Sequence, residues 1–150
     1  MKKPITLLAF TLLFFTLSCS NDKETLFLKL LAETPELPKG SMVEQYNYVI
    51  IPGSGCSSCI SMARRMIKEG SYAENTFFIF TGFETRKQLK ILYGADFIDG
   101  KNIYLDHNDA FKTGALFSLY PTVIRMSSGF QLTDASTGNK WIWDELNEGE

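Results

Sequence analysis

The stretch YNYVIIPGSGCSSCISMARRMIKEG, residues 46–70, decides the fold. Residues 46–51 are β-branched or aromatic apart from one asparagine, and a Pro-Gly pair ends the run, so we expect a buried strand. From residue 56 to 69 the apolar side chains recur at helical spacing, and Gly70 is a natural helix stop. The stretch therefore predicts a buried strand that turns through Gly-Ser-Gly into a helix beginning at a Cys-x-x-Cys motif.

Cys56 and Cys59 acquire reactivity from this position. The free backbone N–H groups and the positive end of the helix dipole at a helix N-terminus stabilise a thiolate. Because the thiolate is the attacking species, Cys56 is expected to be the reactive thiol. Cys59 follows three residues later, on the same side of the helix and more buried, where it can resolve a mixed disulfide formed at Cys56.

The remainder of the chain alternates between strand and helix patterns. The expected strands are residues 76–80, 102–105, 121–126 and 130–133. The expected helices are residues 25–32 on the domain edge, a helix capped by Thr81 and ending near Tyr93, one from Asn108 or Asp109 to Gly114, and residues 141–146. This alternation predicts an α/β layer fold whose first strands are parallel and whose last hairpin forms an antiparallel edge.

Tyr120-Pro121-Thr122 is the second informative motif. Proline cannot donate a hydrogen bond to a sheet, so Pro121 belongs at the first residue of a strand. In the expected topology this residue lies across from the cysteine turn. A cis peptide bond between Tyr120 and Pro121 would fit that position.

Together, these features resemble the thioredoxin superfamily: a Cys-x-x-Cys at a strand-to-helix junction, a strand opened by Pro-Thr, an edge hairpin and a terminal helix. The resemblance covers about residues 42–150. The long spacing between Cys59 and Pro121 leaves room for an extra helix and strand, about residues 84–105. That insertion resembles the membrane-anchored thioredoxin-like reductases of bacterial envelopes and the peroxiredoxin branch.

The resemblance implies a role for each motif residue. Cys56 matches the nucleophile and Cys59 the resolving thiol. Pro121 matches the cis-proline that lines the substrate groove, with Tyr120 and Thr122 beside it in the substrate-binding segment. The implied substrates are protein disulfides, with a further redox partner to recycle the cysteine pair and no bound organic cofactor.

Residues 1–18 have the pattern of a targeting sequence. Lys2 and Lys3 precede an uncharged, largely apolar run of 13 residues, 5–17, which as a helix reaches only about 20 Å against a bilayer core of about 30 Å. Ser18-Cys19 then resembles a lipoprotein cleavage site, where Cys19 would become the acylated N-terminus. A simple secretory signal or an uncleaved anchor is the alternative. We therefore divide the chain into a signal peptide, 1–18, a tether with a short helix, 19–41, and a thioredoxin-like domain, 42–150.

The charge of the chain limits its partners. The full chain has 15 basic and 17 acidic residues, and removing residues 1–18 takes away two lysines and no acid. An acidic body without a basic patch gives no support to nucleic-acid binding. It also does not bind anionic lipid by charge, so the acyl chains on Cys19 would attach the domain to the membrane.

The sequence thus predicts a thiol–disulfide oxidoreductase of the bacterial cell envelope, acting through Cys56 and Cys59. One alternative is a binding lipoprotein that keeps the fold without catalysis, with Trp141 or Trp143 as interface anchors. Another is a copper(I) protein, because copper(I) accepts two thiolates. Structural zinc needs four ligands, and beyond the two thiols the chain offers only the single His107, so no metal site is predicted.

Overall fold

The computed structural model describes residues 21–39, 45–70, 72–100, 102–114, 116, 118–126 and 129–147. The expected signal peptide and the expected lipidation site at Cys19 lie outside these residues, as does the expected domain boundary near residue 42. No helix within the described part of the chain is long and apolar enough to cross a membrane.

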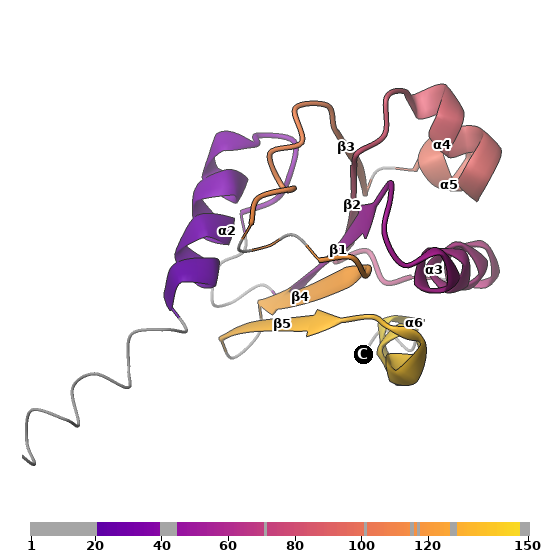
Figure 1. The fold of residues 1–150 in the computed structure, drawn as a ribbon. Helices are drawn as coiled ribbons and strands as arrows, with labels where there is room; N and C mark the ends of the chain where they lie inside the picture. Colours follow the sequence, from indigo (N-terminus) through magenta and orange to yellow (C-terminus); the bar gives the residue numbers. More distant parts are fainter. Residues whose placement is uncertain are drawn as a thin grey trace, which may run out of the picture.

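A five-stranded mixed sheet forms the centre of the molecule, with strand order β3-β2-β1-β4-β5 (Figure 1). Three strands run parallel, and the last two form an antiparallel hairpin whose inner strand pairs with β1. The strands are β1 (Tyr46–Pro52), β2 (Thr76–Thr81), β3 (Ile103–Asp106), β4 (Thr122–Met126) and β5 (Phe130–Asp134). The predicted α/β class and the antiparallel edge are confirmed, and this topology is compatible with a thioredoxin-like fold.

Helices cover both faces of the sheet (Figure 1). One face carries α3 (Ser57–Glu69), α4 (Arg86–Tyr93), the short α5 (Ala95–Ile98) and α6 (Trp141–Asn147), and the other carries α2 (Asn21–Glu33). Side chains of β1 alternate between the two cores: Val49 and Ile51 face α3, whereas Tyr48 and Ile50 face α2. Burial on both faces is why the β1 sequence is a continuous apolar run.

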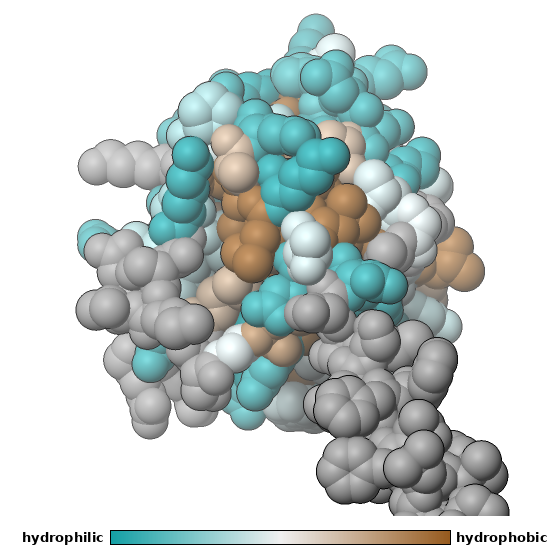
Figure 2. Space-filling model, turned by 90° about the vertical axis from the view of Figure 1, so that its left-hand side faces the viewer, coloured by the Kyte–Doolittle hydropathy of each residue, from teal (hydrophilic) through white to brown (hydrophobic). Residues whose placement is uncertain are grey.

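The helix expected on the domain edge, α2, instead packs on the face of the sheet. Phe27 is fully buried. The centroid of its ring lies 5.1 Å from the ring centroid of Tyr48 and 6.2 Å from that of Phe111. Figure 2 shows the surface that carries α2, where hydrophilic residues surround a small apolar area. Leu28 lies on this outer side of the helix and is 40% exposed. The helix therefore completes the second core.

The start of α4 differs from the prediction. Thr81 does not cap this helix, because β2 continues through Thr81, which pairs with Pro52 on one side and Asp106 on the other. The cap is Thr85, whose hydroxyl accepts a hydrogen bond from the backbone N–H of Gln88 at 3.2 Å. The same Ser/Thr-x-x-Glu/Gln signature occurs four residues later than expected.

The helix expected from Asn108 or Asp109 to Gly114 does not form, and residues 107–114 make turns. The cause is Asp106, the last residue of β3, which is only 1% exposed. Its two carboxylate oxygens accept hydrogen bonds from the backbone N–H groups of Ala110 and Phe111, each at 2.9 Å. A carboxylate that binds nearby backbone donors offers the chain an alternative to helical hydrogen bonds.

We expect Asp106→Asn to lower the free energy of unfolding by about 2 kcal/mol, because one charge-assisted acceptor is lost and a buried N–H then faces an amide group. Urea unfolding followed by circular dichroism measures the change. Asp96→Asn is the matched control, since Asp96 is exposed and forms no ion pair with any described residue. Equal losses in the two variants would contradict a structural role specific to Asp106.

Candidate functional site at the cysteine pair

Cys56 and Cys59 form a disulfide at the junction between β1 and α3, with their Cα atoms 5.3 Å apart. Cys56 is the N-cap residue of α3, and its sulfur accepts a hydrogen bond from the backbone N–H of Cys59 at 3.4 Å. Cys56 is partly exposed, whereas Cys59 is only 2% exposed. As the sequence predicted, the first sulfur is accessible at the helix N-terminus and the second lies more deeply.

Ser58 is a neighbour of both sulfurs that the sequence analysis did not single out. Its hydroxyl oxygen lies 3.3 Å from the sulfur of Cys56 and 4.0 Å from that of Cys59. In the reduced protein, this hydroxyl and the Cys59 N–H are placed to donate to a thiolate at Cys56, and hydrogen bonds to an ionised acceptor are stronger than neutral ones. The feature of the sequence that could have identified Ser58 is its position as a hydroxyl residue between the two cysteines of the motif.

Two glycines allow neighbouring backbone to approach the cysteine loop from both sides. Gly53 donates its N–H to the carbonyl of Thr81 at 2.8 Å, and a Cβ atom on Gly53 would clash with the carbonyl of Gly82. On the other side, Cys56 donates its N–H to the carbonyl of Leu119 at 2.8 Å. A Cβ atom on Gly55, which has a φ of +144°, would clash with that same carbonyl. The Gly-Ser-Gly segment is thus required by close packing as well as by the turn.

The segment before β4 lies directly against the cysteines, as its position in the sequence predicted. Leu119, bonded to Cys56, is 56% exposed, and the adjacent Tyr120 is 37% exposed. These two side chains are therefore accessible next to the accessible sulfur. Leu119 was not among the predicted site residues; its contact depends on the sheet bringing β1 and β4 together.

Two expectations for Tyr120-Pro121-Thr122 need correction. The Tyr120–Pro121 bond is trans, the lower-energy form, and Pro121 enters β4 with its carbonyl accepting from Ala135 N–H at 2.7 Å. Thr122 is 1% exposed, and its hydroxyl donates to the carbonyl of Tyr120 or to the carboxylate of Asp134, each at 3.2 Å. The Thr122 hydroxyl is therefore bonded to Tyr120 or to Asp134 of the neighbouring strand β5, and not to the cysteine pair.

Other potential metal ligands do not gather at the cysteines. Within the described part of the chain, no group of three or more His, Cys, Asp or Glu residues is arranged to hold a metal ion. His107 follows β3, which β2 separates from β1, so the two strands are about 10 Å apart. The carboxylate of Asp106 is already bonded to two backbone N–H groups. Neither residue adds a ligand to the two sulfurs.

The two tryptophans of α6 separate into one core and one surface residue. Trp143 is fully buried in the core beside α3, and Trp141 is 49% exposed. Of the two, only Trp141 offers an exposed ring for a partner.

Comparison of the chain with models of known protein families, with curated proteins and with solved structures finds no match.

Proposed function

We propose that the protein is a thioredoxin-like thiol–disulfide oxidoreductase of a bacterial cell envelope, attached to the membrane by lipid on Cys19. The observation that carries this proposal is the asymmetry of the cysteine pair. Cys56, a partly exposed residue at the N-cap of α3, is disulfide-bonded to Cys59, a residue that is 2% exposed. Cys56 is accessible to the disulfide of another protein, whereas Cys59 is positioned to react only with the sulfur of Cys56.

The exchange reaction is balanced by these two residues and the substrate. In the reduced protein the Cys56 thiolate attacks one sulfur of a substrate disulfide, and the other substrate sulfur leaves as a thiolate that takes up a proton. The thiolate of Cys59 then attacks the sulfur of Cys56, forms the Cys56–Cys59 disulfide, and releases the second substrate thiol. The substrate gains two electrons, and a dithiol partner must return two electrons to the pair.

Substrate contact is expected through side chains of the segment before β4. The carbonyl of Leu119 is bonded to Cys56 N–H, and the N–H of Tyr120 donates to the hydroxyl of Ser118 at 3.2 Å. With these backbone groups engaged, the exposed side chains of Leu119 and Tyr120 are the available surface next to the sulfur. An apolar residue beside the substrate disulfide would pack there.

The topology supports the thioredoxin-like assignment. The strand that leads to the cysteines is central, and the antiparallel hairpin β4–β5 lies beside it. The extra strand expected between the second cysteine and Pro121 corresponds to β3, which forms the far edge of the sheet after α4 and α5.

The equilibrium reduction potential of the pair tests the proposal. We expect a reversible couple between about −120 and −280 mV, the range of redox catalysts. The measurement is a redox titration of the full chain carrying Cys19→Ser, so that only one cysteine pair titrates. A disulfide that stays locked below about −300 mV would indicate a structural bridge and would contradict exchange chemistry.

A further inference from the structure

A second concave site lies at the opposite end of the sheet from the cysteines. It is a cavity of about 570 Å³ at the start of β2 and β3, bordered by the end of α3 and by α5. Thr76 begins β2 and Thr81 ends it beside the cysteine loop, so the two sites are about 17 Å apart along the strand. The volume is within the range of small-molecule pockets.

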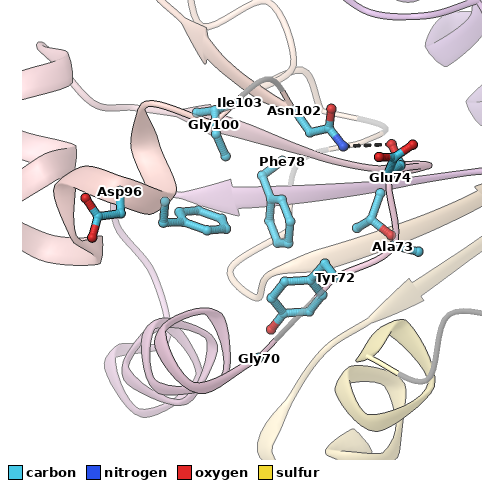
Figure 3. Close-up of a pocket in the computed structure, with 11 residues that line it drawn as sticks. Gly70, Tyr72, Ala73, Glu74, Phe78, Asp96, Gly100, Asn102 and Ile103 are labelled. Carbon is cyan, nitrogen blue, oxygen red and sulfur yellow. Dashed lines mark hydrogen bonds between the residues drawn. The ribbon is translucent and has the colours of Figure 1, made fainter.

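Aromatic side chains form the apolar wall of this cavity. The rings of Tyr72 and Phe78 meet edge to face with centroids 5.0 Å apart, and Phe78 meets Phe97 in the same way at 5.0 Å. Figure 3 shows the Tyr72 and Phe78 rings next to each other in the middle of the site. Such a wall favours an apolar body, and ring faces also attract cations.

Two hydroxyl groups at the cavity have no hydrogen-bond partner among the described residues. Thr76 lines the cavity and is 1% exposed, and its hydroxyl oxygen is unpartnered, as is that of Tyr72. Both oxygens are themselves buried, so neither is presented to the open space of the cavity. Burial raises the pKa of Tyr72 above its ordinary value of 10.0, so the phenol stays neutral.

The charged residues among the described lining of the cavity are acidic. Glu74 and Asp96 line it, and Figure 3 shows them at opposite ends of the aromatic wall. Neither carboxylate forms an ion pair with any described residue, and among the described lining residues none is basic. The nearby Asn102 side chain donates to the backbone carbonyl of Glu74 at 2.7 Å and leaves that carboxylate unpaired.

We propose that this cavity binds a small organic cation, an ammonium group attached to an apolar body. The aromatic wall takes the apolar body and contributes cation–π attraction. A carboxylate at either end, Glu74 or Asp96, pairs with the ammonium. An anion finds no positive group among the described lining residues, and a neutral ligand leaves both carboxylates without a counter-ion.

The test compares two probes of similar size, 2-phenylethylamine, which is charged at pH 7, and 2-phenylethanol, which is neutral. Each is titrated into the full chain at low ionic strength, with binding followed by amide chemical shifts in nuclear magnetic resonance. We expect the amine to bind about tenfold more tightly than the alcohol, with the largest shifts at Thr76, Phe78 and Phe97.

Variants locate the charge preference. In Glu74→Gln/Asp96→Asn we expect the amine to bind no more tightly than the alcohol, with alcohol binding unchanged. The matched control Asp22→Asn/Glu36→Gln also removes two exposed carboxylates, near α2 on the other face of the sheet, and should keep the preference. The proposal is overturned if neither probe binds at millimolar concentration, if both bind equally to the unchanged protein, or if the Glu74/Asp96 variant keeps the preference.

Discussion

Cys56→Ser is expected to reduce disulfide exchange to the background rate, and Cys59→Ser to accumulate mixed disulfides through Cys56. The two outcomes follow from the positions of the two sulfurs. In the proposed mechanism, Cys56, which is partly exposed at the helix N-cap, makes the first attack, and Cys59, which is 2% exposed, acts only on the sulfur of Cys56. Removing the nucleophile prevents the first step, and removing the resolving thiol stops the reaction after that step.

Non-reducing gels of each variant, isolated after exposure to envelope proteins, measure the trapped species. The Cys59→Ser chain should appear in higher-mass bands that disappear when dithiothreitol reduces the mixed disulfides. The Cys56→Ser chain should form no such bands. Cys19→Ser is the control for the third cysteine and should leave exchange by the detergent-solubilised chain unchanged. Trapping by Cys56→Ser in place of Cys59→Ser would reverse the assigned roles.

The Cys56→Ser/Cys59→Ser chain distinguishes catalysis from binding. If the cellular role depends on exchange, the double variant should lose it as completely as a deletion does. A double variant that keeps the full cellular role would contradict the proposed activity and favour a binding lipoprotein on the same fold. Circular dichroism of the variant shows whether it retains its fold.

Elements defined by local signals could be predicted from the sequence. The β1 strand and α3 helix follow from a continuous apolar run, a Pro-Gly stop and helical periodicity, all within 25 consecutive residues, 46–70. The hairpin of β4 and β5 and the position of α6 follow equally local patterns. The position of Cys56 at the helix N-terminus was therefore accessible without any knowledge of the sheet.

Elements decided by distant contacts could not be predicted in this way. Thr81 has the spacing of a helix cap, yet its pairing with Pro52 and Asp106 keeps it in β2. Residues 108–114 contain helix-capping residue types, but the buried Asp106 carboxylate binds the backbone N–H groups that follow it. In both places a tertiary contact satisfies the backbone differently from the local pattern.

The surroundings of the site depend even more on the fold. Leu119 reaches Cys56 across 63 residues of sequence, and only the pairing of β1 with β4 brings them together. The cavity near Thr76 is assembled from the end of α3, the starts of β2 and β3, and α5. The Tyr120-Pro121-Thr122 motif indicates that this segment approaches the cysteine turn, but no motif marks the contact of Leu119 with Cys56 or the cavity, because these roles are set by neighbours in space.

Gly55→Ala is expected to destabilise the protein by about 3 kcal/mol and to slow disulfide exchange. An alanine at a φ of +144° is strained, and its Cβ would clash with the carbonyl of Leu119, which accepts the Cys56 N–H. Strain of this kind costs about 1–3 kcal/mol, and loss of the hydrogen bond adds about 1 kcal/mol. Because that bond holds Cys56 against the segment before β4, its loss should also disturb the proposed substrate surface at Leu119 and Tyr120.

Substitutions at two other glycines separate the effect of backbone strain from the effect of a steric clash. Gly94 has a φ of +101° with open space around its Cβ position, so Gly94→Ala should show the strain alone, about 1–2 kcal/mol. Gly114 has neither a strained φ nor a close neighbour, so Gly114→Ala should be neutral or slightly stabilising. Urea unfolding and exchange rates are measured for all three chains. If packing against Leu119 positions Cys56, Gly55→Ala should lose the most stability of the three variants and should be the only one that slows exchange. If Gly55→Ala instead matches Gly94→Ala in stability and in exchange rate, the contact with Leu119 is irrelevant to the site.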